Sequence, residues 1–335
     1  MERKFIELKN KLNNCTKLLI TLSKPDGDSI GSAIALYKLL KDDRNNIDVV
    51  SSFFIPTYLM KFPDAKVINI QDVGKIDFNN YDAVIVVDSS NAERVIEFSN
   101  YPDGWNFPDN VFIISFDHNA SHNINFADID IFEPLVSSTC ELVYDFANYA
   151  GLNIDNDVAT LLYSGIFTDS GGFTYSNTTS KSLHIAGELM NHGADIGILD
   201  KILNEPKQFD SLILLSKILQ DLTIIKEENF AYTLTIIDRE IVKNISDEVL
   251  SQVIYMLKDD PAFIQKVKGT DFGILIYPGS NCTNVSFRAT NNKFNLSKIC
   301  IKFGGGGHPL ACAFHSVKRY DEILSDLNNE IKQLK

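Results

Sequence analysis

Short apolar segments that end on an aspartate, separated by helical patterns, constrain this chain most strongly. Residues 82–88 (DAVIVVD) and 111–117 (VFIISFD) are runs of β-forming residues, and each closes on a carboxylate. Alternation of such runs with amphipathic helices is typical of βαβ units and predicts an α/β fold with a mainly parallel sheet flanked by helices. A carboxylate that closes a run then lies at the carboxyl end of a strand, where open α/β sheets build their binding sites.

The remaining elements follow from the same periodicities. A capping-box spacing from Ser138 to Glu141 predicts the start of one helix. Further strands are expected at residues 17–22, 48–54, 66–70, 231–237, 273–277 and 285–288. Further helices are expected at residues 29–41, 156–167, 179–191, 247–257 and 321–334.

A chain of 335 residues is longer than one hydrophobic core usually organises, so two domains are expected. We predict an N-terminal domain over residues 1–190, a helical connector over 191–223 and a smaller C-terminal α/β domain over 224–335. Charge separates the two parts: residues 1–223 carry a net charge of -14, and residues 224–335 carry +1. The acidic excess therefore belongs to the N-terminal part.

Net charge limits the possible binding partners, and cysteine content indicates the cellular compartment. With 31 basic and 44 acidic residues the net charge is -13, which disfavours binding to long double-stranded nucleic acid or to an anionic membrane but permits short phosphorylated ligands. Five scattered cysteines without a C-x-x-C spacing indicate a reducing, cytoplasmic setting. The N-terminus lacks the apolar core of a signal peptide, and no segment has 18 consecutive apolar residues.

Four segments bring acidic side chains and one imidazole to the ends of expected strands or helices. Singly, each aspartate is more simply a turn former, and Asp28 could equally cap the helix that begins at Ser29. Jointly they form an oxygen-rich set with one nitrogen, which suits Mn²⁺ or Mg²⁺ better than Zn²⁺. The candidate ligands are Asp26, Asp28, Asp88, His118 and Asp169.

A second candidate site lies in the last third of the chain, in the string FGGGGH at residues 303–308. Each glycine costs about 0.5 to 1 kcal/mol of ordering relative to alanine, so the string requires a reason. Backbone N–H groups that approach an anion closely would supply one, with His308 beside them, whereas the simpler interpretation is a flexible hairpin loop. Upstream, Ser286 and Arg288 alternate onto one strand face, where Arg288 could bind phosphate or merely be solvated.

The ordered motifs PDGDSIGS, VVDSS, FDHN, FTDSGGF, VSFR and FGGGGH resemble those of the DHH/DHHA1 phosphoesterase superfamily, in its nanoRNase/pAp phosphatase branch. The resemblance covers nearly the whole chain. It implies a DHH domain that holds two Mn²⁺ ions and hydrolyses a phosphate ester with metal-activated water. It assigns metal and catalytic roles to Asp26, Asp28, Asp88, His118 and Asp169, with Asp88 shared by both ions. It assigns substrate contacts in a DHHA1 domain to Arg288, Gly305, Gly306, Gly307 and His308.

Two positions depart from the motifs of that family. Leu22 stands where a metal-binding histidine is usual, and Asn119 replaces the second histidine of the Asp-His-His motif. We therefore expect one well-bound ion and a weaker or absent second ion. Asn119 is expected to donate a hydrogen bond to a phosphate oxygen. His122 could compensate for a missing histidine, but a solvated loop position is the simpler expectation.

The leading hypothesis is a Mn²⁺- or Mg²⁺-dependent hydrolase of short nucleotides, such as di- to tetranucleotide RNA, pGpG or pAp. The alternative is a DHH-fold protein with weakened catalysis that binds or senses a nucleotide, as Leu22 and Asn119 suggest. A manganese-type inorganic pyrophosphatase ranks lower because it gives no reason for FGGGGH. The expected partner is a short oligonucleotide or nucleotide phosphate, not a membrane or long duplex, and a homodimer is left open.

Overall fold

The chain folds into two compact units, Met1–Glu205 and Pro206–Lys335. The computed structural model describes residues 1–41, 46–97, 100–101, 103–119, 122, 126–203, 207–258, 267–279, 281–289 and 293–334.

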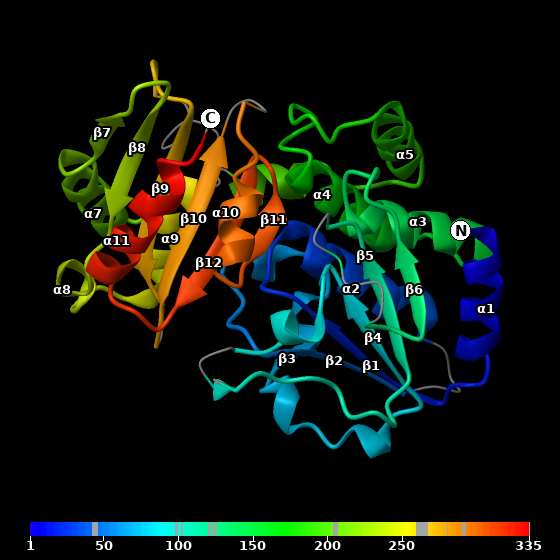
Figure 1. Cartoon of the computed structure of the whole chain (residues 1–335). Coiled ribbons are helices and arrows are strands. Elements are labelled where there is room, and N and C mark those ends of the chain that lie inside the picture. The colour runs from blue at the N-terminus through cyan, green and yellow to red at the C-terminus, as the bar shows by residue number, and fades with distance from the viewer. Residues whose placement is uncertain are drawn as a thin grey trace. The chain divides into compact units, whose positions relative to one another are not determined.

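The first unit is built on a parallel sheet (Figure 1). Its strands lie in the order β3-β2-β1-β4-β5-β6, and every neighbouring pair is parallel. The order reverses between β1 and β4, and open sheets of this kind bind ligands at that reversal, beyond the carboxyl ends of the strands. The strands are β1 (Lys17–Leu22), β2 (Asn46–Ser51), β3 (Ile68–Ile70), β4 (Ala83–Val87), β5 (Ile113–Asp117) and β6 (Ile129–Phe132).

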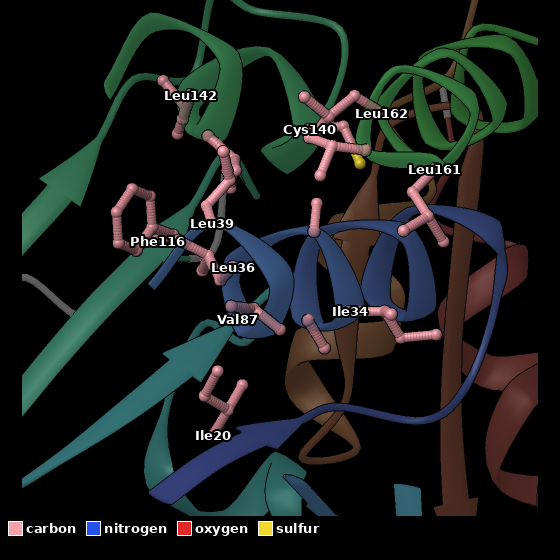
Figure 2. Close-up of a cluster of buried hydrophobic side chains, with 14 of the residues drawn as sticks. Ile20, Ile34, Leu36, Leu39, Val87, Phe116, Cys140, Leu142, Leu161 and Leu162 are labelled. Carbon is pink, nitrogen blue, oxygen red and sulfur yellow. The ribbon is translucent and has the colours of Figure 1, made fainter. Parts of the chain in front are cut away.

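Helices cover one face of this sheet. Alternate strand residues such as Ile20, Val87 and Phe116 point toward them and join one buried cluster with the helices (Figure 2). Burial of this apolar face is the main source of the unit's stability. The helices are α1 (Glu2–Leu12), α2 (Gly27–Leu40), α3 (Thr139–Ala150), α4 (Asn156–Asp169), α5 (Ser180–Asn191) and α6 (Gly197–Leu203), with short 3-10 turns at η1 (Leu59–Lys61) and η2 (Ala65–Val67).

The opposite face carries short turns and aromatic side chains. Leu19, Val84 and Val86 point to this side and pack in a separate cluster with Phe78 and Phe107. The ring of Trp105 lies 4.8 Å from that of Phe107, edge-on. The 3-10 turns here are η3 (Val73–Lys75), η4 (Phe78–Asn80) and η5 (Ala92–Val95).

The second unit has a mixed sheet in the order β11-β12-β10-β9-β8-β7, in which only β8 and β9 are parallel. Its two faces pack on separate helix pairs, α7 with α9 and α10 with α11. The strands are β7 (Thr223–Lys226), β8 (Ala231–Ile236), β9 (Phe272–Pro278), β10 (Thr283–Ala289), β11 (Gly306–His308) and β12 (Ala311–Ser316). The helices are α7 (Phe209–Gln220), α8 (Arg239–Val242), α9 (Asp247–Lys258), α10 (Ser297–Lys302) and α11 (Tyr320–Ile331).

The predicted α/β fold with a mainly parallel sheet is confirmed, and the differences are local. The expected strand over 48–54 ends at Ser51, and the strand over 66–70 begins as a 3-10 turn. The segment expected to connect the domains, 191–223, is divided: α6 lies in the first unit, and α7 packs on α9 in the second. Among the described residues, no helix combines the length and the apolar character needed to cross a membrane.

Candidate functional site

The two aspartates that follow β1 have different tasks. Asp26, which is exposed, caps α2: its Oδ1 accepts hydrogen bonds from the backbone N–H groups of Asp28 and Ser29, at 3.1 and 2.9 Å. Asp28 is buried and accepts from the backbone N–H groups of Thr139 and Cys140, at 2.7 and 2.9 Å. The positive N-terminal end of α3 therefore stabilises the Asp28 carboxylate. The helix cap that Asp28 could have supplied is made by Asp26 instead.

Close packing of α2 against α4 holds Asp28 in place. An added Cβ atom at Gly165 of α4 would lie 2.3 Å from the Cys140 sulfur and 3.1 Å from Asp28 Oδ1. At Gly31 of α2 it would lie 2.7 Å from the backbone oxygen of Leu161. These glycines allow α2 and α4 to pack closely, which places Asp28 near the C-terminal half of α4.

Gly165→Ala is expected to lower the free energy of unfolding by about 1 to 3 kcal/mol, because the added methyl group overpacks this contact. Gly187→Ala is the matched control: Gly187 is exposed on α5 with no atom within 4 Å of the added Cβ. That change is expected to stabilise the protein by about 0.5 to 1 kcal/mol. Urea unfolding measures both. Equal effects of the two substitutions would contradict the close contact.

Asp88 follows β4 in an unusual backbone conformation. Its φ angle is +50°, a left-handed value that costs an L-residue roughly 1 to 2 kcal/mol. Such strain is retained mainly where function requires it. Asp88 Oδ1 accepts a hydrogen bond from Asn119 Nδ2 at 3.0 Å, and Oδ2 accepts from Ser23 Oγ at 3.3 Å. Both carboxylate oxygens are thus oriented by neighbouring donors.

Three carboxylates converge on His118, which follows β5. Its Nε2 atom lies 3.3 Å from Asp169 Oδ2, 3.7 Å from Asp28 Oδ2 and 3.8 Å from Asp88 Oδ1. One ligand atom from each of Asp28, Asp88 and His118 fits within 4.8 Å of the others. Four of the five predicted metal ligands therefore come together at the carboxyl ends of the central strands. The fifth, Asp26, is near enough for its charge to act on Asp88.

The electrostatics of this group favour a cation. Burial, and then the charges of Asp26 and Asp28, raise the pKa of Asp88 well above its usual range. Burial lowers the pKa of His118, but the surrounding carboxylates outweigh it and raise that pKa overall. Buried carboxylates at such range repel one another unless a cation neutralises them. The oxygen-rich donor set with one imidazole fits a divalent ion such as Mn²⁺ or Mg²⁺.

The side chain of Asn119 points at carboxylates. Its Nδ2 atom donates to Asp117 Oδ1 at 2.7 Å as well as to Asp88 Oδ1. An amide nitrogen has two hydrogens, so both are used. The predicted hydrogen bond from Asn119 to a phosphate oxygen would require one of these bonds to break.

His122 is not a solvated loop residue, so that expectation was wrong. Its side chain is fully buried between Asp117 Oδ2, at 2.6 Å from Nδ1, and Asp130 Oδ1, at 2.9 Å from Nε2. Its ring stacks on Phe132 with centroids 4.3 Å apart. Burial lowers its pKa, but hydrogen bonds to the two carboxylates raise it to about 9.

Because the pKa of His122 is raised, the stability of the metal-free protein is expected to depend on pH. Because its pKa is about 9 in the folded chain and about 6.5 when unfolded, its stabilising contribution is complete below pH 6.5 and disappears as the pH rises through 9. The expected loss is on the order of 3 kcal/mol. It is measured as the difference in unfolding free energy between wild type and His122→Gln at pH 6, 7.5 and 9.5. A difference that stays constant with pH would contradict the assignment.

Leu22 accounts for the missing ligand of the expected first metal site. It is fully buried at the end of β1, in the apolar cluster beneath the helices. The carboxylate of Asp26 is held by the first turn of α2. The residues expected at the first site thus consist of the shared Asp88, a helix cap and an apolar side chain.

In the second unit the glycine string is ordered. Gly304, with φ of +77°, follows the C-terminal end of α10, and Gly306 to His308 form β11. A Cβ atom at Gly305 would lie 2.2 Å from the backbone oxygen of Ala313 on β12. The glycines are thus needed for a turn and for close strand packing, so the flexible-loop interpretation was wrong. The anion-binding interpretation stays a prediction.

The register of this sheet relates Arg288 to His308. Ala311 of β12 pairs with Arg288 of β10 on one side and with His308 of β11 on the other. Directly opposite residues of an antiparallel pair point to the same face, so Arg288, Ala311 and His308 form one row. The small alanine separates two side chains that can contact an anion.

Sequence reasoning missed several residues that shape the site. Asp130 was detectable as an acidic residue within the apolar strand β6, and Ser23 as a polar residue directly after β1. The backbone N–H groups of Thr139 and Cys140 had no sequence signal, because they reach Asp28 only through the packing of α2 against α3. Ser138 caps α3 as expected, because its Oγ accepts a hydrogen bond from the Glu141 backbone N–H. The Glu141 carboxylate accepts hydrogen bonds from the Ser137 and Ser182 hydroxyls instead of closing the capping box.

Part of the first unit matches a known protein family. Residues 17–166 match the family model described as "DHH family, N-terminal domain". Within the first unit, this segment is therefore similar to the N-terminal domain of DHH proteins. Beyond that segment, the similarity to curated proteins extends over nearly the whole chain. It is 27% identical to the probable bifunctional oligoribonuclease and PAP phosphatase NrnA of Streptococcus mutans, over 92% of this chain and 93% of that protein.

A second relative and a solved structure extend the comparison along the whole chain. The bifunctional oligoribonuclease and PAP phosphatase NrnA of Bacillus subtilis is 26% identical, over 92% of this chain and 93% of that protein. The crystal structure of an exopolyphosphatase-related protein from Bacteroides fragilis superposes with a TM-score of 0.77 at 23% identity, covering 98% of this chain and 95% of that one. The two proteins therefore share a fold.

Proposed function

We propose that the protein is a divalent-metal-dependent phosphoesterase that hydrolyses short nucleotides, such as di- to tetranucleotide RNA, pGpG or pAp. The convergence of Asp28, Asp88 and Asp169 on His118 Nε2 carries this proposal. It lies at the strand-order reversal of a parallel sheet, where such folds bind ligands. Relatives at 26 to 27% identity, described as oligoribonuclease and PAP phosphatase, support the substrate class.

We assign one ion, with Mn²⁺ preferred, to Asp28, Asp88, His118 and Asp169. When bound, such an ion acts as a Lewis acid on phosphoryl oxygen and lowers the pKa of water. Asp28 reaches the site with its charge already stabilised by the start of α3. Asp88 is held by Ser23 and Asn119. Asp26 remains a candidate for a weaker second ion, because Leu22 supplies no ligand.

In the second unit we propose that the nucleotide phosphate or base contacts Arg288, Gly305, Gly306, Gly307 and His308. The row Arg288, Ala311 and His308 supports this, because it presents a guanidinium and an imidazole on either side of a small residue. Arg288 provides a planar fork for phosphate oxygens. Arg288→Lys is therefore expected to raise KM more than it lowers kcat.

The test is hydrolysis of pAp, pGpG and a short RNA by purified protein in Mn²⁺, followed by chromatography of the released mononucleotide or phosphate. Asp88→Asn protein, purified identically, controls for contaminating nucleases. We expect turnover of at least one substrate by wild type and its loss in EDTA. Absence of product from the whole panel would contradict the proposal.

The second candidate is a nucleotide-binding or regulatory protein with weakened catalysis. Leu22 in the core and the use of both Asn119 amide hydrogens by carboxylates favour it. Micromolar binding of a nucleotide without turnover, in protein that binds Mn²⁺, would support it. Strong wild-type turnover would exclude it.

A further inference from the structure

A chain of hydrogen bonds runs from β6 to the centre of the candidate metal site. Asp130 Oδ1 contacts His122 Nε2 at 2.9 Å, and His122 Nδ1 contacts Asp117 Oδ2 at 2.6 Å. Asp117 Oδ1 accepts from Asn119 Nδ2, which also donates to Asp88 Oδ1. Asp117, Asn119 and the His122 side chain are buried. The chain is Asp130, His122, Asp117, Asn119 and Asp88.

In each hydrogen bond of this chain, only one assignment of donor and acceptor is chemically possible. Both ring nitrogens of His122 face carboxylate oxygens, so both act as donors. Asn119 must direct its amino group toward Asp117 and Asp88, since its carbonyl oxygen would repel them. Asp117 receives a further hydrogen bond from the Asn119 backbone N–H, at 3.2 Å. These contacts fix the orientation of the Asn119 amide before any ligand arrives.

We propose that Asn119 and His122 are positioning residues that hold the Asp88 carboxylate in the orientation needed to bind the metal ion. This rests on the proposed metal role of Asp88. His122 acts at a distance: it ties Asp117, on β5, to Asp130, on β6, and so keeps the acceptor of the Asn119 amide in place. Asn119 then fixes Asp88 Oδ1, while Ser23 fixes Oδ2.

The asparagine at position 119, which replaces the usual histidine, then has a positive role in metal binding and need not indicate lost catalysis. A neutral amide can donate to two carboxylates at once. Partners that orient metal ligands typically contribute 10- to 100-fold to metal affinity. The expected consequence is that Asn119 and His122 variants change Mn²⁺ affinity as well as turnover.

The experiment is a titration of metal-free protein with Mn²⁺, with free Mn²⁺ followed by electron paramagnetic resonance. Asn119→Ala is expected to weaken binding by about 10- to 100-fold, and His122→Gln by about 10-fold. His184→Gln, at an exposed position on α5, is the matched control and is expected to bind as wild type does. Unchanged affinity in folded Asn119→Ala protein would overturn the proposal.

A double-mutant cycle tests whether the two residues act through one chain. If they do, the double variant loses little more affinity than Asn119→Ala alone, because His122 then has nothing left to position. Additive losses would overturn the connection. If His122→Gln does not fold, Asp130→Asn and Asp130→Ala replace it. The asparagine oxygen still accepts from Nε2, so only the alanine variant is expected to lose affinity, and equal losses would overturn the proposal.

Mn²⁺ binding and substrate hydrolysis are measured in separate assays, so the positioning role and the proposed hydrolysis can be contradicted independently. Weakened Mn²⁺ binding in the variants without substrate turnover by wild type would retain the positioning role and remove the proposed hydrolysis. Turnover by wild type with unchanged Mn²⁺ affinity in the variants would retain hydrolysis and remove the positioning role. Wild-type protein that binds no Mn²⁺ would overturn both.

Discussion

Asp88→Asn is expected to lower kcat by roughly 10³-fold, because loss of about 4 kcal/mol of metal stabilisation corresponds to three factors of ten. The same change is expected to make metal-free protein more stable. Burial and the nearby Asp26 and Asp28 charges disfavour an ionised Asp88, and an isosteric amide removes that cost. Steady-state kinetics and thermal unfolding in EDTA measure the two effects.

Asp82→Asn provides the matched control for this prediction. Asp82 lies at the opposite end of the same strand and accepts hydrogen bonds from the backbone N–H groups of Thr16 and Lys17. Its replacement is expected to lower stability slightly and to leave kcat unchanged. Wild-type turnover by the Asp88→Asn protein would show that Asp88 is not required for the reaction.

Asp28→Ala is expected to lower the free energy of unfolding by about 2 to 6 kcal/mol, because two buried N–H groups, those of Thr139 and Cys140, lose their acceptor at about 1 to 3 kcal/mol each. Metal binding is lost as well, since Asp28 is a proposed ligand. Urea unfolding in EDTA isolates the structural part. Asp28 thus contributes to both folding and function, whereas Asp88 is costly to the metal-free fold.

Asp155→Ala is the control for the structural effect of Asp28. Asp155 caps α4 through one hydrogen bond, to the backbone N–H of Val158, outside the metal cluster. Its loss is expected to cost about 1 kcal/mol, as at an ordinary helix cap. A similar small loss for Asp28→Ala would show that the link from α2 to α3 contributes less than its geometry implies.

The parallel sheet and the convergence of Asp28, Asp88, His118 and Asp169 could be predicted from the sequence for one physical reason. Parallel strands are buried on both faces, so their sequences are continuous apolar runs. A carboxylate that ends such a run therefore lies at the carboxyl end of a strand. Asp88, Asp117 and His118 follow this rule. Asp169 was found in the same way at the end of an apolar helix.

The interactions of individual side chains could not be predicted. Whether Asp26 or Asp28 caps α2 depends on the start of α3, more than 100 residues away in the chain. The His122 side chain is buried with its ring between Asp117, at the end of β5, and Asp130, on β6. The ordered glycine segment depends on its pairing with β12. Each case is a contact between distant segments, which local periodicity does not encode.

The most direct test of a single functional metal site is a Mn²⁺ titration of metal-free wild-type protein, with bound metal and hydrolysis of a short nucleotide measured in the same samples. The account predicts that one ion binds per chain with high affinity and that turnover reaches its plateau at that ion. Mn²⁺ binding without turnover of any substrate in the panel, or turnover that rises only with a second ion, would contradict it.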